Sequence, residues 1–196
     1  MYPDREKAKQ LLEEAVRRNP GPWERHSELV AECAERIASR CGLDTEKAYV
    51  CGLLHDIGRR FGKGHFRHIV DGWDYMQSLG YEEAARICLT HSFHTGTVQG
   101  YIGNFDVPPE RVEEMERFLS EREFDEYDKL IQLCDSMASD RILDLEERMA
   151  DVERRYGAYP QEKKEKIWEL KAHFEELCGE GIYQMVEGVG QYGETV

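Results

Sequence analysis

Apolar residues recur at intervals of three and four along most of this chain, and the alternation typical of half-buried strands is scarce. Short segments that cannot continue a helix interrupt this pattern. The first is Asn19-Pro20-Gly21-Pro22, in which each proline lacks the backbone N–H that a helix interior requires. The chain contains no internal repeat and no low-complexity tract. The pattern predicts an all-α fold built as a helical bundle.

The expected helices lie between these breaks. They cover about residues 4–18, 23–39, 44–57, 66–79, 82–91, 110–119, 124–143, 146–156 and 161–177. The segment 93–107 is either a flap over a site or a connector, since long loops in compact domains are often functional. We expect the glycine-rich tail after residue 178 to be loosely ordered. A chain of 196 residues fits one domain, residues 1–196, with a core over about 23–143 and further helices over about 144–178.

Charge and hydropathy restrict the kinds of partner. The net charge of −14 repels nucleic-acid backbones, so we expect no long nucleic acid as a partner. No apolar run approaches the ~18 to 20 residues that span a bilayer, and the first residues lack the pattern of a secretory signal. We therefore expect a cytoplasmic protein that does not contact membranes. The six cysteines include no CxxC pair and are expected to be small core residues rather than bridges or zinc ligands.

Ionisable residues lie on the apolar faces of five expected helices. They are His26, His55, His68, His91 and Asp135. Taken singly, a histidine on an apolar face is more simply a hydrogen-bonded core residue. Burying several unpaired polar groups together costs roughly several kcal/mol unless something common satisfies them, and a metal ion does so. Imidazole and carboxylate without thiolate suit Fe, Mn, Zn, Co or Ni in a catalytic site, and the spacing does not choose among these metals.

A known signature matches some of these residues. His26, the dipeptide His55-Asp56 in GLLHDIGR and Asp135 in LIQLCDSMA resemble the H…HD…D signature of the HD superfamily. The likeness covers about residues 23–143. It implies a single-domain helical bundle of the HD-domain type, in which these four residues bind a divalent metal. Most known members hydrolyse phosphate esters or anhydrides, often of nucleotides.

Two more histidines resemble the additional ligands of two-metal members of that superfamily. They are His68, within an H-x-x-x-G motif, and His91. The likeness therefore implies one or two divalent ions, with Asp56 bridging them where there are two. Several two-metal members carry a second adjacent histidine where this chain has Ser92, which leaves open whether His94 is a ligand. The chain also lacks the GYP segment of cyclic di-GMP phosphodiesterases.

The resemblance implies a divalent-metal-dependent phosphohydrolase, a phosphomonoesterase or phosphodiesterase, that acts on a small phosphorylated substrate, with nucleotides among the candidates. Asp56 and Arg59 are the expected catalytic residues. Arg59 resembles a basic residue that many relatives keep after HDIG, and it is expected either to hold a phosphate oxygen or to be a surface arginine paired with glutamate. Two alternatives remain open: a di-iron oxygenase of the same fold, and a non-catalytic module that binds metal or nucleotide. The substrate and the oligomeric state are not predicted.

Overall fold

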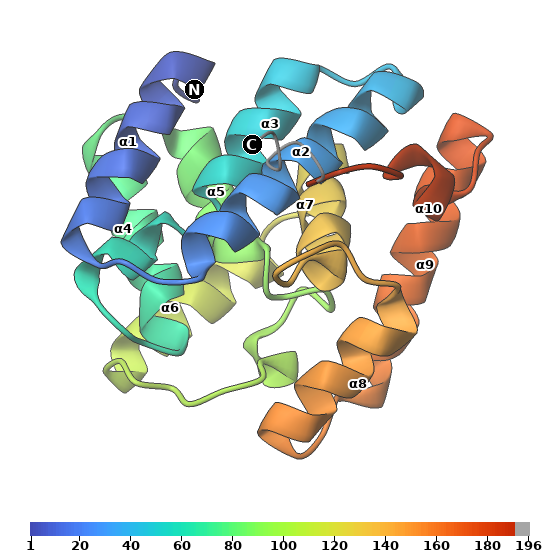
Figure 1. Cartoon of the computed structure of the whole chain (residues 1–196). Coiled ribbons are helices and arrows are strands. Elements are labelled where there is room, and N and C mark those ends of the chain that lie inside the picture. Colours follow the sequence, from blue (N-terminus) through green and yellow to red (C-terminus); the bar gives the residue numbers. More distant parts are fainter. Residues whose placement is uncertain (191–196) are drawn as a thin grey trace.

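The computed structural model describes residues 1–190, and these residues form helices and connecting loops without a β-strand (Figure 1). The helices are α1 (Arg5–Arg18), α2 (Trp23–Cys41), α3 (Thr45–Leu54), α4 (Phe66–Ser78), α5 (Glu82–Thr90), α6 (Pro109–Ser120), α7 (Glu126–Met137), α8 (Leu145–Tyr156), α9 (Gln161–Cys178) and α10 (Ile182–Met185), with the 3₁₀ helices η1 (Ile57–Phe61) and η2 (Val98–Gly100). The expected all-α fold class is confirmed.

Aspartate side chains start several of these helices. Asp4, Asp44 and Asp144 each accept a hydrogen bond from a backbone N–H in the first turn of α1, α3 and α8, respectively. Asp125 begins α7 with a capping box, in which its carboxylate and that of Asp128 each accept from a backbone N–H of the other residue. These bonds satisfy donors that a helix cannot satisfy internally, so the starts of these helices are encoded locally.

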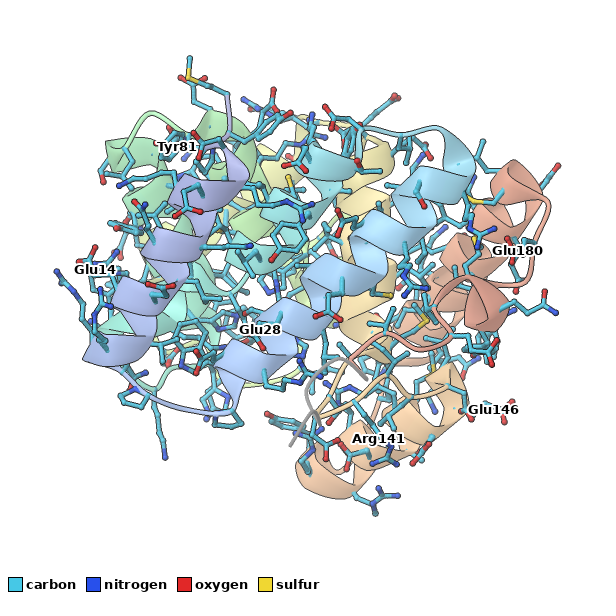
Figure 2. The ribbon with its side chains drawn as sticks, turned by 45° about the horizontal axis from the view of Figure 1, so that its top comes forward. Glu14, Glu28, Tyr81, Arg141, Glu146 and Glu180 are labelled. Carbon is cyan, nitrogen blue, oxygen red and sulfur yellow. A yellow bond between two sulfur atoms is a disulfide. The ribbon has the colours of Figure 1, made fainter. Side chains whose placement is uncertain are left out.

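Helix α7 lies beside α2 and α3 in the middle of the bundle, with α1, α4 and α5 on one side and α8, α9 and α10 on the other (Figure 1). Helices α2 and α3 pack closely because Gly52 has no side chain. A Cβ at this position would lie only 2.7 Å from the Cα of Ala31. Acidic side chains such as Glu14, Glu28 and Glu146 lie on the outer faces of their helices (Figure 2). Within the described residues, no helix is long and apolar enough to cross a membrane.

Three helix boundaries or segments differ from the sequence prediction. Helix α7 ends at Met137 rather than near Leu143, because Ala138 is extended and pairs with Ile142 in an isolated antiparallel bridge. Helix α3 ends at Leu54, and η1 follows in place of a continuing α-helix. The expectation of a loosely ordered tail is wrong up to residue 190, since α10 buries Ile182 and Met185 in the core. Residues 191–196 lie outside the described part of the chain.

The cysteine prediction holds for four residues and fails for two. Cys33, Cys51, Cys88 and Cys134 are buried free thiols, as expected. Cys41 and Cys178 form a disulfide, with their Cα atoms 4.6 Å apart. Each is the last residue of its helix, α2 or α9, and the bundle brings these two helix ends together. That meeting depends on tertiary packing, which the spacing of cysteines along the chain does not reveal.

Candidate metal centre

Three of the histidines expected in the site are oriented by backbone carbonyl groups. The Nδ1 atom of His55 lies 2.7 Å from Gly52 O, and that of His91 lies 2.9 Å from Cys88 O. The Nδ1 atom of His68 is bonded to His65 O. A carbonyl oxygen only accepts, so each Nδ1 carries a proton, and in the neutral ring each Nε2 carries the lone pair. Metal-binding histidines typically use this same arrangement to fix the ring and its tautomer.

The first cluster consists of His26, His55 and Asp135, which come from α2, the end of α3 and α7. The His26 Nε2 atom lies 2.9 Å from Asp135 Oδ1 and 3.2 Å from His55 Nε2. The His55 Nε2 atom lies 3.8 Å from the same Asp135 oxygen. The three ligand atoms thus lie within 4.8 Å of one another, at separations that suit ligands of one ion.

The second cluster consists of Asp56, His68 and His91, and all three side chains are buried. The Asp56 Oδ1 atom lies 3.1 Å from His68 Nε2 and 3.7 Å from His91 Nε2. The two clusters adjoin, since the other carboxylate oxygen of Asp56 lies 3.9 Å from His55 Nε2. Asp56 therefore has one oxygen in the second cluster and one directed toward the first.

Two buried atoms of the second cluster have no hydrogen-bond partner. They are Asp56 Oδ1 and His68 Nε2, which lie close to each other without forming a hydrogen bond. With the Nδ1 proton on a neutral His68 ring, both atoms are acceptors. Two buried acceptors that face each other are unfavourable unless a cation lies between them. The residues therefore fit a metal ion.

The electrostatic environment favours the protonation states that bind metals. Burial raises the pKa of Asp56, but the charge of Arg59 beside it outweighs this effect and holds that pKa well below its usual value. The pKa of Asp135 is likewise held low, against its burial, chiefly by its hydrogen bond with His26. Burial lowers the pKa of His91 to about 3. At neutral pH, Asp56 and Asp135 are ionised and His91 is neutral, as ligation requires.

Arg59 lies directly beside the second cluster. Its Nε–H donates to Asp56 Oδ2, and its side chain lines the same cavity as the clusters. This arginine is therefore not the glutamate-paired surface residue that was the alternative expectation. His65, which is exposed, orients His68 through its carbonyl oxygen and belongs to neither cluster.

His94 is buried but lies outside both clusters. Its Nε2 atom lies 3.0 Å from Ser136 Oγ and 3.3 Å from Gln132 O. The segment 93–107 contributes Tyr101 and Ile102 to the cavity wall, and the Tyr101 ring packs edge to face on Phe66. This segment is thus part of the wall of the site and not only a connector.

Both clusters open into a cavity of about 490 Å³. One wall comes from α8 and α9 and includes Arg148, Arg155, Tyr156 and Lys163. Lys163 is only 8% exposed, its Nζ donates to Ser92 O at 3.1 Å, and burial lowers its pKa to about 8. Sequence reasoning missed this wall, although one signal was present. Lys163 lies on the apolar stripe of α9, four residues before the fully buried Ile167.

Comparison with known proteins gives one match. The family model of the HD domain matches residues 6–140. Searches of curated proteins and of solved structures gave no match. The matched segment begins in α1, earlier than the likeness noted from the sequence, and contains all six residues of the two clusters, whereas α8 and α9 lie beyond it. The chain belongs to the HD domain family, whose members are generally metal-dependent phosphohydrolases.

Proposed function

We propose that this protein is a divalent-metal-dependent phosphohydrolase that cleaves a phosphate ester or anhydride of a small molecule. In this proposal the first cluster and the second cluster would each hold one ion, and Asp56 would be a ligand available to both. The observation that carries the proposal is the pair of buried acceptors, Asp56 Oδ1 and His68 Nε2, which lie 3.1 Å apart without a hydrogen bond. A hydrogen-bonded core would have paired each of them with a donor.

The chemistry follows from general properties of such centres. A bound divalent ion lowers the pKa of a water ligand toward about 7 and polarises a phosphoryl oxygen. The protein residues prepare this site. The ionised Asp56 and Asp135 offset part of the positive charge of the ions, and the carbonyl bonds to Nδ1 hold three of the imidazole rings in orientation.

Arg59 has the second role in this proposal. Its Nε–H is bonded to Asp56, and the guanidinium has further N–H donors on the cavity side. A phosphate oxygen bound there receives charge-assisted hydrogen bonds in fixed geometry. The same interaction stabilises negative charge that develops on the phosphoryl group during hydrolysis.

The test begins with metal content, measured by elemental analysis on protein purified without added metal or affinity tag. We expect two transition-metal ions per chain in the wild type. His26→Gln and His68→Gln should each lower the count, because each removes a ligand from a different cluster. The matched control is His173→Gln, a histidine on α9 that is bonded to Glu126 and lies outside the site. It should keep the wild-type count.

Activity is then measured as phosphate release from aryl phosphate mono- and diesters under anaerobic conditions, with each of Mn, Fe, Co, Ni and Zn. Hydrolysis that disappears in His68→Gln and survives in His173→Gln supports the proposal. Oxygen consumption by the iron-loaded protein, without hydrolysis, would support the oxygenase alternative instead. Absence of bound metal after reconstitution with all five metals would refute the metal centre and favour the non-catalytic module.

A further inference from the structure

Lys163 is a buried cation without a carboxylate partner among residues 1–190. The side chain is 8% exposed, and the hydrogen bond that its Nζ makes goes to a backbone carbonyl, Ser92 O. An ammonium group has three N–H donors, so two remain for another acceptor. Burial of a charge is unfavourable unless an opposite charge or several hydrogen bonds compensate it.

The position of Lys163 in α9 makes this burial notable. Ile167, Leu170 and Phe174 continue the same stripe of α9, at four, seven and eleven residues after it, and they pack into the main core. An apolar residue at position 163 would extend that packing. Lys163 instead lies at the end of the stripe where α9 meets the cavity of the metal clusters.

A second cation faces the same space. Arg148 on α8 lines the main cavity together with Lys163, and both also line an adjoining cavity of about 130 Å³. The two charges are close enough for Arg148 to disfavour the charged form of Lys163. Arg148 donates through Nε to Ala138 O, and its contact with Asp151 is a longer one of 3.5 Å. An anion between the two side chains would replace this repulsion with attraction.

The metal clusters cannot supply that anion from their own carboxylates. Asp135 is the acid that most stabilises the charge of Lys163, but its Oδ1 lies 2.9 Å from His26 Nε2 in the first cluster. Arg155, which lies at the same wall, is already paired with Asp151. Among the described residues, Lys163 is therefore the cation of this wall without a carboxylate contact, whereas Arg148 has only its 3.5 Å contact with Asp151.

We propose that Lys163 and Arg148 form an anion subsite that binds a second phosphoryl group of the substrate, while the first is held at the metal clusters. The inference rests on the proposed function and narrows it to substrates that carry two phosphoryl groups. Both residues lie outside the segment matched by the HD domain, so the subsite is a feature of the C-terminal helices of this chain.

The test is calorimetric binding of two non-hydrolysable probes to the metal-loaded protein, methylphosphonate with one phosphoryl group and methylenediphosphonate with two. Wild-type protein should bind the diphosphonate more tightly. Lys163→Met should weaken diphosphonate binding by about 10- to 100-fold, as expected for a lost charge-assisted hydrogen bond, and should change methylphosphonate binding by less than about twofold. Metal content is measured after each titration, because diphosphonates also chelate metals.

Matched variants keep the result interpretable. Lys166→Met is the control, since Lys166 lies on α9, is half exposed and is paired with Glu169. It should bind both probes as the wild type does. Arg148→Met should reproduce the loss seen in Lys163→Met, and it decides the matter if Lys163→Met does not fold. Lys163→Arg should retain part of the diphosphonate preference.

The outcomes separate this inference from the proposed function. An unchanged diphosphonate preference in Lys163→Met and Arg148→Met overturns the subsite, as does a wild type that binds neither probe. Ester hydrolysis, measured on the same preparations, tests the proposed function. Hydrolysis without any effect of Lys163 on probe binding overturns the subsite alone. A diphosphonate preference that depends on Lys163, without hydrolysis of any ester or anhydride that carries one or two phosphoryl groups, leaves the subsite standing and refutes the hydrolase.

Discussion

Gly58 is the residue at which a single methyl group should disturb the metal centre most selectively. It lies in η1, where the chain passes against α4. A Cβ atom at this position would lie 1.9 Å from His68 O, 2.5 Å from Gly72 N and 2.9 Å from His68 C. All three are backbone atoms, which cannot rotate away. Reaching even 3.0 Å from His68 O requires a displacement of at least 3.0 − 1.9 = 1.1 Å.

The displacement falls on the second cluster. Gly58 is two residues after Asp56 and in contact with the backbone of His68. The ligand atoms of these two residues, Asp56 Oδ1 and His68 Nε2, lie 3.1 Å apart. Metal ligands tolerate shifts of about 0.2 Å, so Gly58→Ala should lose the ion of this cluster. The first cluster, on α2, α3 and α7, should keep its ion. Overpacking costs about 1 to 3 kcal/mol, which corresponds to a fall in Tm of about 2 to 12 °C for a chain of this length.

The measurements are ions per chain by elemental analysis and Tm by circular dichroism. Gly100→Ala is the matched control, because its new Cβ would meet only Thr95 Oγ1 within 4 Å, at 3.5 Å. This control should keep the wild-type metal count and Tm. A Gly58→Ala protein with an unchanged metal count and an unchanged Tm would refute the reasoning from backbone contact between η1 and α4.

Three further predictions concern stability and turnover. Burial lowers the pKa of His94 to about 3, so between pH 6.5 and 3 the unfolded chain binds a proton at this residue that the folded chain does not, and acidification destabilises the fold. From pH 6.5 to pH 5 the free energy of unfolding should fall by about 2 kcal/mol through this residue. In urea unfolding of metal-free protein, the stability of His94→Gln should depend less on pH than that of the wild type, and an equal pH dependence would contradict this. Cys178→Ser should lower the free energy of unfolding by about 2 to 4 kcal/mol, because the disulfide closes a loop with a sequence separation of 137. Thiol titration of the denatured wild type should give four free thiols before reduction and six after it. Six free thiols before reduction would mean that the bridge does not form. Arg59→Ala should lower kcat/KM by about 10- to 100-fold, as expected for the loss of a charged hydrogen bond to substrate, without changing the metal count, and an unchanged kcat/KM would exclude its role in phosphate binding.

Helical periodicity predicted the fold class and the inward direction of the site residues well, because both depend on local geometry. Whether a side chain lies on the apolar face of a helix is decided within two or three turns of chain. The apolar pattern predicts inward positions for His26, His68 and His91, and the structure brings all three to one cavity. Aspartate caps such as Asp44 are local signals of the same kind.

The parts that sequence did not predict depend on which helix ends meet. The disulfide between Cys41 and Cys178 joins the ends of two helices that are 137 residues apart. The cavity wall of α8 and α9 is also formed by tertiary packing, since α7 ends at Met137 and the chain turns before α8 begins. Lys163 is an intermediate case. The sequence already places it on the apolar stripe of α9. The argument used for the histidines, that an ionisable residue on an apolar face needs a partner, applies to it equally.

Helix α3 ends earlier than the sequence predicts, directly before the two residues that connect the clusters. In a continuous α-helix, successive side chains point about 100° apart, so His55 and Asp56 would diverge into different surroundings. Here the helix ends at Leu54, and Asp56 leaves the helical conformation with φ −103° and ψ 14°. The change directs an Asp56 oxygen to within 3.9 Å of His55 Nε2, with one residue in each cluster. The end of α3 thus lies at the point in the chain where the two clusters adjoin.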